Sequence, residues 1–344
     1  MNAAAKNYDG VNKYIRITDI DEASSTYTDK DIVSPDGVLT DNYLVNNRDI
    51  LLARTGASTG KSYLYKKSDG KLYYAGFLIR ANVTTHDPYF VFSQLHTHRY
   101  WRWVSIMSAR SGQPGINSQE YSSFPIYTTS IEEESKIAKL LSLLDERIAT
   151  QNKIIDKLQS LIKGISNRIF ASIQGIEYRM GDIVTITNGN SNVQDAVTQS
   201  KDGLYPFFDR SEEIKYLPTF LFDKEAIIYP GEGTEFMPRY FKGKFALHQR
   251  CYAIFDFNEI INARFLYFYL KTRNSYFVKN AVGSTVPSLR LDTFQKLKVI
   301  IPPTKTQHSV SSCLSSMEQK CNVEKKILHK LLKQKQYLLR QMFI

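Results

Sequence analysis

The stretch RTGASTGKS, Arg54 to Ser62, comes within one residue of a nucleotide-binding P-loop. In a P-loop, four residues separate the first Gly from the Gly-Lys-Ser, and the backbone N–H groups wrap a phosphate ahead of a helix N-terminus. Here only three residues separate Gly56 from Gly60, and Thr55 stands where the first glycine should be. The sequel SYLYKKSDGKLYY is rich in Tyr and contains the turn signal Ser-Asp-Gly, which predicts a hairpin and not a helix. The spacing therefore argues against ATP binding.

Two acidic turns raise a second possibility, a metal-dependent nuclease, because such enzymes hold Mg²⁺ with carboxylates. Asp36 stands in Pro-Asp-Gly, and Asp69 stands in Ser-Asp-Gly-Lys, which ends at Lys71. Both stretches are turn formers first. A free-standing nuclease is therefore the least favoured function.

Other residue types that carry chemistry are poorly placed for it. His96 and His98 stand two residues apart in a predicted helix, so they would point to different faces and make poor joint metal ligands. The sequence contains no Asn-Pro-Pro-Phe or Asp-Pro-Pro-Tyr stretch and no Gly-rich cofactor loop. We therefore expect no catalytic residue, no metal and no cofactor in this chain.

The composition is that of a globular protein with a strong positive charge. Of 344 residues, 42% are hydrophobic and 23% are charged, which suits two or three domains with cores of their own. The net charge of +11 favours DNA as a partner, because each Lys or Arg that replaces a condensed counterion strengthens binding. Three cysteines without a CxxC pair, no apolar segment of bilayer length and no signal peptide predict a cytoplasmic protein that does not enter the membrane.

The chain is built twice. SGQPGINSQEYSSFPI, from Ser111, aligns with STVPSLRLDTFQKLKV, from Ser284, at a constant offset of 173 residues. The same offset continues without a gap into the next segment, where Phe170 meets Phe343. A register kept over about sixty residues indicates an internal repeat. Each half is then a globular region followed by a long helix.

Each long helix carries one apolar seam with the spacing of a coiled coil. Ser130 and Glu133 form a capping-box pattern that places the start of the first helix. Gln151 and Glu324 occupy the same repeat position and interrupt both seams at one layer. The predicted packing residues are Ile137, Leu141, Leu144, Ile148, Ile155 and Leu158 in the first helix, and Val310, Leu314, Met317, Leu328 and Leu331 in the second.

Two seams of equal length in one chain are the simplest mutual partners, so we expect the helices to pack on each other. At 1.5 Å per residue each helix would be about 60 Å long, enough to hold two globular regions apart. The alternative is that each seam covers only its own globular region.

Each globular region mixes short strands with helix. In the first half, strand-like DILLA and FLIRANV precede the helical pattern of PYFVFSQLHTHRYWRWVSIM; in the second, AIIYP and CYAIFDF precede that of INARFLYFYLKTRNSYFVKN. The second region opens with YRMGDIVTITNGNSNVQDAV, which has no equivalent in the first half, so the first region is expected to lack its opening strand and loop. We predict an α+β fold with globular domains at 1–129 and 174–303 and long helices at 130–173 and 304–344.

Together these motifs resemble the specificity subunit of type I restriction-modification enzymes. The resemblance rests on the duplicated SGQPGI and STVPSL stretches that run into FPI and KVIIPP, on the amphipathic helices that follow, and on DILLARTGASTGK upstream. It implies two target recognition domains that each read one half of a bipartite, asymmetric DNA site, with two antiparallel helices between them that set the length of the unread gap. It also implies two methyltransferase subunits docked along the helices and two motor-nuclease subunits that join them. This chain itself would be non-catalytic.

The residue chemistry is compatible with such a DNA reader. RTGASTGK and the rough counterpart IIYPGEGTEFMPR, in which Gly56 is matched with Gly231, would present backbone N–H groups to phosphates. Arg suits guanine edges and Gln suits adenine edges. The candidate DNA-contacting residues are Arg54, Lys61, Arg110, Gln113 and Asn117 in the first half, and Arg239 and Arg290 in the second.

A general scaffold remains the main alternative to a DNA reader. In that interpretation the twin helices organise other proteins and the positive charge is incidental. Two divergent globular halves that are rich in glycine turns favour recognition, because a bare scaffold does not require them.

Overall fold

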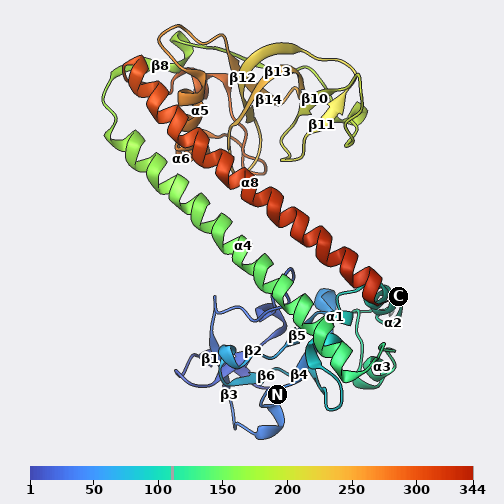
Figure 1. Ribbon diagram of the computed structural model, residues 1–344. Coiled ribbons are helices and arrows are strands. Elements are labelled where there is room, and N and C mark those ends of the chain that lie inside the picture. Colours follow the sequence, from blue (N-terminus) through green and yellow to red (C-terminus); the bar gives the residue numbers. More distant parts are fainter. Residues whose placement is uncertain (110–111, 344) are drawn as a thin grey trace. The chain divides into compact units, whose positions relative to one another are not determined.

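The computed structural model describes residues 1–109 and 112–343, which form two compact units (Figure 1). The first unit comprises Met1–Ile154 and Glu324–Ile344, and the second comprises Ile155–Val323. Each unit therefore holds one globular region together with parts of both long helices. None of the helices in the described ranges is both long and apolar enough to cross a membrane.

The first globular region is built from short strands followed by three helices. Its strands form three small sheets, ordered β1-β3, β2-β6 and β5-β4-β7. The strands are β1 (Ala4–Asn7), β2 (Lys13–Ile15), β3 (Val33–Asp36), β4 (Asp49–Ala53), β5 (Ser62–Leu64), β6 (Leu72–Tyr74) and β7 (Leu78–Asn82). The helices are α1 (Pro88–Gln94), α2 (His98–Met107) and α3 (Ser118–Ser122).

The second globular region centres on a six-stranded sheet of order β11-β10-β13-β12-β14-β9, beside a two-stranded sheet of β8 and β15. Its strands are β8 (Ile176–Arg179), β9 (Thr185–Asn188), β10 (Tyr205–Phe208), β11 (Lys215–Leu217), β12 (Phe222–Pro230), β13 (Arg239–Leu247), β14 (Cys251–Phe255) and β15 (Lys298–Ile301). Its helices are α5 (Ala263–Lys271), α6 (Asn274–Asn280) and α7 (Leu291–Gln295).

The two globular regions share a central strand flanked by the same neighbours. In the first, β4 lies between β5 and β7; in the second, β12 lies between β13 and β14, and all four pairings are antiparallel. Fully buried aromatic and aliphatic side chains fill both cores, and all of β4 and the last five residues of β12 are buried. The two predicted helical stretches each divide into a pair of helices, α1 and α2 in one half and α5 and α6 in the other.

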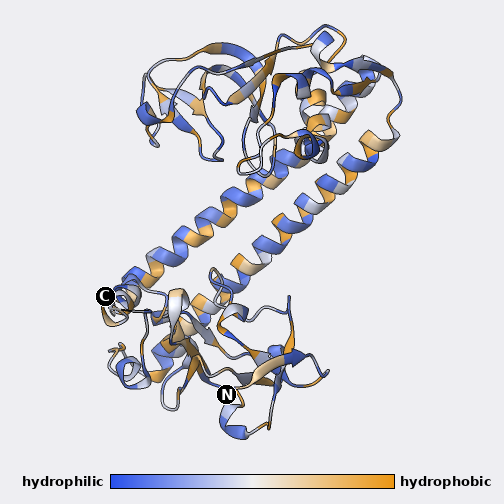
Figure 2. Ribbon diagram, turned by 180° about the vertical axis from the view of Figure 1, so that it is seen from behind, coloured by the Kyte–Doolittle hydropathy of each residue, from blue (hydrophilic) through white to orange (hydrophobic). Residues whose placement is uncertain are grey.

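The long helices are α4 (Ile131–Ser172) and α8 (Thr304–Met342). Ser130 Oγ accepts a hydrogen bond of 3.3 Å from the Glu133 N–H group at the start of α4. Hydrophobic residues recur among hydrophilic ones along both helices (Figure 2). Within the first unit the two helices run antiparallel, because early residues of α4 contact late residues of α8.

In the first unit, the early turns of α4 pack against the last turns of α8. Ala138 and Leu141 form one apolar cluster with Leu339, Phe343 and the α1 residue Phe90. Farther along α4, Gln151 Nε2 donates hydrogen bonds to Glu324 O (3.1 Å) and Glu324 Oε2 (2.6 Å), so the two interruptions of the seams meet. Both residues are buried there. The seam in this unit thus serves the partner helix and the globular region at once.

The other predicted packing residues also lie on the inner side of their helices. In the second unit, Leu314 is buried in the main core with Val310 and Met317 against it. The seam positions Leu144 and Ile155 are buried, and Ile137, Ile148, Leu158, Leu328 and Leu331 are half-buried. The coiled-coil spacing therefore identifies the covered face of each helix.

One local prediction is wrong. The segment after Lys61 does not form a hairpin: β5 pairs with β4, and β6 pairs in parallel with β2. The turn signal itself is real, since Gly70 has a φ of +81° and ends a short 3-10 turn. Pairing with β2, far away in the sequence, overrides the local alternation.

The two halves differ where the second has its extra opening segment. β15 pairs with β8, whose last two residues, Tyr178 and Arg179, open that segment. Residues 125–128, at the matching repeat position and within the described range, form no strand. Instead the Gln94 side chain accepts a hydrogen bond from Tyr127 N (2.8 Å) and donates one to Tyr127 O (2.9 Å). One buried amide thus replaces a strand partner.

Leucines at adjacent positions of α4 test the packing of the first unit. Leu141 is 1% exposed and Leu140 is 47% exposed. We expect Leu141→Ala to lower the free energy of unfolding by about 2–5 kcal/mol, because it leaves a cavity against Leu339 and Phe343. Leu140→Ala should change it by about 0.5 kcal/mol or less. Chemical denaturation of the two variants measures the difference, and equal losses would contradict this packing.

Candidate nucleic-acid interface

The glycine turn of the first unit, Arg54–Lys61, joins β4 to β5 and is fixed against the loop before α3. Gly56 N donates to Pro114 O (2.9 Å), and Ile116 N donates to Arg54 O (2.9 Å). Gly60 lies against α2: its φ is +93°, and a Cβ there would stand 2.7 Å from a methyl carbon of Val104. Glycine is required at this position because α2 leaves no room for a side chain.

The N–H groups of this turn are used inside the protein. Gly60 N donates to Ala53 O (3.1 Å) and to the Tyr121 hydroxyl (3.1 Å). Thr59 N donates to Gly56 O (3.0 Å), and Lys61 N donates to Ser58 O (3.0 Å). The expectation that this turn presents a set of N–H groups to phosphates is therefore wrong for these positions. At these four positions the turn is a support, and contact with a ligand falls to the side chains around it.

The second unit repeats the same junction with a shifted correspondence. Leu289 N donates to Gly231 O (2.8 Å), and Gly233 N donates to Pro287 O (3.0 Å). Since Leu289 and Ile116 are repeat partners, Gly231 corresponds to Arg54 and Gly233 corresponds to Gly56. The match of Gly56 with Gly231 is thus wrong by two residues, because β12 and the turn after it are spaced differently from β4.

The structure places the first-half candidates in three different settings. Arg54 and Gln113 are exposed beside the turn. Lys61 forms an ion pair of 3.1 Å with Glu22 and its side chain is only 19% exposed. Asn117 caps α3, where its side chain accepts a hydrogen bond from Glu120 N (2.9 Å). Arg110 lies outside the described residues.

The two second-half candidates also differ. Arg290 is exposed at the start of α7, next to the Gly231–Gly233 turn. Arg239 turns inward: its guanidinium donates to Asp209 O and lies 5.3 Å from the Phe208 ring centre. Burial lowers the pKa of Arg239. This environment suits a residue that supports the surface from below.

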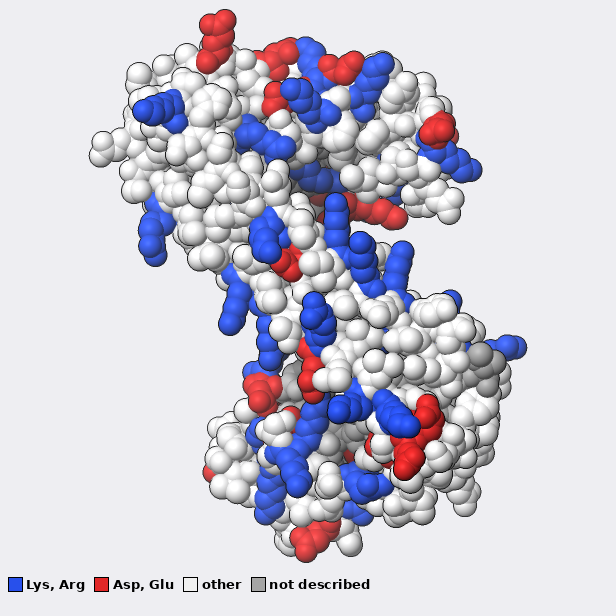
Figure 3. Space-filling model, viewed as in Figure 1, with Lys and Arg blue, Asp and Glu red and all other residues white. Residues whose placement is uncertain are grey.

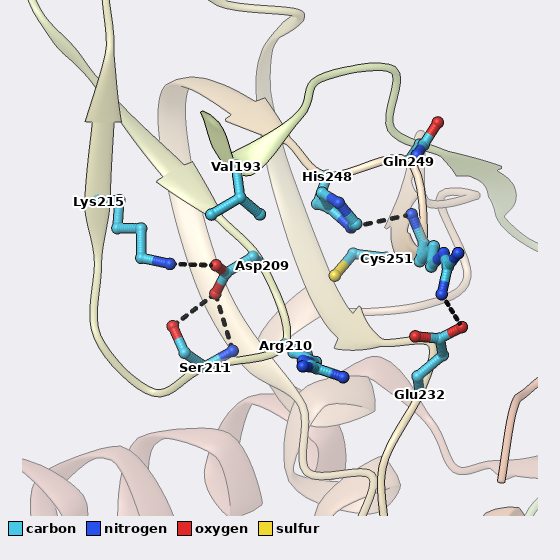
Figure 4. A pocket seen from close by; sticks show the side chains of 10 residues that line it. Val193, Asp209, Arg210, Ser211, Lys215, Glu232, His248, Gln249 and Cys251 are labelled. Carbon is cyan, nitrogen blue, oxygen red and sulfur yellow. Dashed lines mark hydrogen bonds and ion pairs between the residues drawn. The ribbon is translucent and has the colours of Figure 1, made fainter. Parts of the chain in front are cut away.

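An open hollow of about 500 Å³ lies directly beside the second glycine turn (Figure 4). Its lining residues are Val193, Asp209, Arg210, Ser211, Lys215, Glu232, His248, Gln249, Arg250 and Cys251. They meet because β10 and β13 pair in parallel, so both strands end at the same edge. His248 N donates to Phe208 O (2.9 Å), which joins the two strand ends.

Ion pairs organise the side chains of the hollow. Lys215 Nζ lies 2.7 Å from Asp209 Oδ2, and Arg250 Nη1 lies 2.8 Å from Glu232 Oε1. Burial alone would raise the pKa of Asp209, but hydrogen bonds from Lys215 and Ser211 outweigh burial and lower it. Three cations and two ion-paired carboxylates line the hollow, so its net charge is positive.

Two further side chains give the hollow polar edges. Gln249 is exposed. Burial lowers the pKa of His248, and its Nδ1 accepts a hydrogen bond of 3.2 Å from Arg250 N, which favours a neutral ring that can donate from Nε2. An arginine, a glutamine and a neutral histidine at one edge can supply donors and acceptors to base edges or phosphates.

Sequence reasoning missed Arg210, Gln249 and Arg250. Local patterns do not show that β10 and β13 pair in parallel, and only this pairing brings Arg210 near Arg250. The available signal was the polar run His248-Gln249-Arg250 directly after a strand pattern.

Charged side chains are spread over the visible face of both units, and Lys and Arg stand along the exposed sides of the long helices (Figure 3). Asp69 accepts a hydrogen bond of 2.6 Å from the Tyr63 hydroxyl, and Asp36 lies in β3 with Lys6 at 3.8 Å. Within residues 1–109 and 112–343, no group of three or more His, Cys, Asp or Glu residues could hold a metal ion.

Comparisons with known proteins agree on one family. The family described as "Type I restriction modification DNA specificity domain" matches residues 1–160 and again residues 176–333. The EcoDI specificity subunit of Escherichia coli is 28% identical over 138 residues, and the MjaVIII specificity subunit of Methanocaldococcus jannaschii is 28% identical over 127 residues. These alignments cover 40% and 37% of this chain but only 30% and 29% of the two relatives.

Solved structures show the same fold over nearly the whole chain. The S subunit of a type I restriction-modification system from M. genitalium has a TM-score of 0.68 at 17% identity, over 99% of this chain and 94% of that one. A chain from a study of complex assembly and conformational transition in the type I R-M system has a TM-score of 0.54 at 14% identity, over 96% of this chain and 90% of that one.

Arg239 and Arg210 provide a test of which side chains face the ligand. We expect Arg239→Ala to lower the free energy of unfolding by about 1–3 kcal/mol, because it removes a half-buried guanidinium that donates to Asp209 O. Arg210→Ala, at an exposed position, should leave stability within about 0.5 kcal/mol and weaken DNA binding. Thermal denaturation and DNA titration of both variants measure this, and the reverse pattern would place Arg239 in the interface instead.

Proposed function

The chain belongs to the family of type I restriction modification DNA specificity domains, and we propose that it is the subunit that selects the DNA site for such an enzyme. Each globular region reads one half of a bipartite, asymmetric site, and the two long helices set the unread gap between the halves. The observation that carries this proposal is that the family match occurs twice and each match contains one globular region with its glycine turn. This chain itself is non-catalytic.

The two glycine turns support different readers on one scaffold. Both are fixed to the loop before a short helix by the same pair of backbone hydrogen bonds. The side chains around them differ: Arg54 and Gln113 stand beside the first turn, and Arg210, Gln249, Arg250 and Arg290 stand beside the second. An asymmetric DNA site requires this combination, because the geometry must be common while the base contacts differ. Lys61, Asn117 and Arg239 support the contacting residues in this proposal.

The long helices also provide a surface for partner subunits. Leu140 and Leu143 of α4 are 47% and 54% exposed, beside the buried Leu141 and Leu144. Neighbouring exposed apolar side chains on one helix face form a patch of the kind that marks protein interaction sites. We assign this face to a methyltransferase subunit, with two such subunits and two motor-nuclease subunits in the full enzyme. We also place the complex in the cytoplasm, acting on double-stranded DNA.

Selection from random DNA tests the recognition function. The chain, purified together with a methyltransferase subunit of the same type I system, should enrich one bipartite sequence with a gap of fixed length. We expect the double variant Arg210→Ala, Arg250→Ala to weaken preference in one half-site by about 1–3 kcal/mol per lost base contact and to leave the other unchanged. The pair Arg54→Ala, Gln113→Ala should affect the opposite half-site. Failure of the unmodified complex to enrich any bipartite site would refute the proposal in favour of a scaffold.

Substitutions on either side of the α4 seam test the partner surface. We expect Leu140→Asp with Leu143→Asp to abolish co-purification with the methyltransferase subunit, because two charges would enter an apolar interface. Ala149→Asp with Asn152→Asp places the same charges at the same spacing on the other flank of the seam and should leave co-purification intact. Equal loss in both double variants, or in neither, would show that this face is not the docking site.

A further inference from the structure

A fully buried polar side chain stands at the same place in both long helices. Glu134 is the fourth residue of α4 and Gln307 is the fourth residue of α8, and the offset of the internal repeat relates them. Both are 0% exposed. Buried polar groups require partners, and in both cases the partner is the globular region next to the helix.

In the first unit Glu134 binds the start of α1. Its Oε2 accepts a hydrogen bond of 2.9 Å from Asp87 N, and its Oε1 lies 2.8 Å from His86 Nδ1. Asp87 is the N-cap of α1, and its own side chain accepts hydrogen bonds from Tyr89 N and Phe90 N.

In the second unit Gln307 binds the start of α5 in the same way. Its Oε1 accepts a hydrogen bond of 2.7 Å from Asn262 N. Its Nε2 donates to Ile260 O (2.8 Å) and Pro302 O (2.9 Å). Asn262 is the N-cap of α5, and its side chain accepts a hydrogen bond from Phe265 N.

The need for these contacts follows from the sequence of α1 and α5. In a capping box, a Glu or Gln at the third helical position reaches back to the N–H group of the N-cap residue. That third position is Phe90 in α1 and Phe265 in α5, and both rings are buried in the cores. A phenylalanine cannot accept this hydrogen bond. The long helix supplies the missing acceptor, so each capping box is completed by another helix.

A second polar contact repeats eleven residues farther along each long helix. Asp145 Oδ2 accepts a hydrogen bond of 2.6 Å from the hydroxyl of Tyr89 in α1. Its repeat partner Glu318 accepts one of 2.8 Å from the hydroxyl of Tyr267 in α5. Two contacts at separated points fix both the position of a helix and its angle.

We propose that Glu134 and Gln307 are positioning residues: each locks one recognition domain at a fixed orientation on its long helix, and the fixed length of the unread DNA gap depends on both. This inference rests on the proposed DNA-reading function. A domain whose capping acceptor is lost keeps its own core and its base-contacting side chains. It loses the constraint that holds those side chains at one distance along the DNA.

The two locks differ in chemistry, and the difference predicts an asymmetric response to exchange. Glu134→Gln keeps an oxygen for Asp87 N, and its amide nitrogen can donate to His86 Nδ1. It gives up only the long hydrogen bond (3.4 Å) that Oε1 accepts from Thr129 N. Gln307→Glu turns the donor that faces the carbonyl oxygens of Ile260 and Pro302 into an acceptor. The first exchange should therefore be tolerated, and the second should act like the loss of the side chain.

The experiment is selection from random DNA by the chain in complex with its methyltransferase subunit, followed by counting of gap lengths. Gln307→Ala and Gln307→Glu should keep the bases of both half-sites while gaps one base pair longer or shorter become about tenfold more frequent, the change that corresponds to about 1.4 kcal/mol. Glu134→Ala should do the same, and Glu134→Gln should keep the parental gap.

A control separates positioning from simple loss of stability. Ile228→Val removes one methyl group from a separate apolar cluster of the second region, which contains no residue of α8, and should lower Tm without altering the gap. Broadened gaps in Ile228→Val, or a single parental gap in Gln307→Ala, would overturn the inference.

A second measurement distinguishes failure of this inference from failure of the proposed function. Hydrogen exchange of the Asn262 amide should be slow in the unmodified chain and faster in Gln307→Ala, whatever the chain binds. If no bipartite site is enriched by the unmodified complex, the DNA-reading function is refuted and the gap dependence falls with it. Fast exchange of Asn262 in the unmodified chain would refute the lock itself.

Discussion

The seating of each globular region depends on a backbone N–H group that its own helix leaves without an acceptor. The N-cap residues Asp87 and Asn262 are half-buried, and a buried N–H group left without an acceptor costs roughly 1–3 kcal/mol. Glu134 and Gln307 remove that cost by accepting hydrogen bonds from these N–H groups. They can do so only when each long helix lies at one position relative to its globular region. Apolar packing alone tolerates sliding, because dispersion and the hydrophobic effect are not directional. The hydrogen bonds therefore supply the directionality that a fixed distance between the two half-sites requires.

The glycine turns are also held in place by specific backbone contacts. RTGASTGK resembles a phosphate-binding loop because it shares with it a need for glycine, yet the cause is different. Gly60 is required by the approach of Val104, and the N–H groups of the turn are bonded to Ala53, Tyr121 and other neighbours inside the protein. The turn is thus held in place, and the N–H groups at these positions are not available to a ligand. Side chains placed around such a support can change without disturbing the fold, which suits a reader whose target differs in each half.

Much of the architecture could be predicted from the sequence, because a repeat and a heptad seam are visible in one dimension. The constant offset located the two halves, and the spacing of Leu141 and Leu314 identified the covered faces of the helices. The polar layer of Gln151 and Glu324 was visible for the same reason. Long-range pairing was not visible: β6 pairs with β2, although its local pattern suggested a hairpin with β5. The functional surface of the second unit depends on the parallel pairing of β10 with β13, so Arg210 and Arg250 were missed and Arg239 was chosen.

Arg239 and Arg250 show that arginine serves two purposes in this region. One supports the fold, and the other is open to a ligand. Arg239 lies over the Phe208 ring and donates to a carbonyl oxygen, and burial lowers its pKa. Arg250 is 62% exposed at its side chain and is held by Glu232, which belongs to the glycine turn. A guanidinium that is oriented by a carboxylate and still open to solvent loses less conformational freedom when it meets a base or a phosphate than an unrestrained one. The rigid turn therefore does more than support the sheet edge, because it carries the carboxylate that aims the arginine.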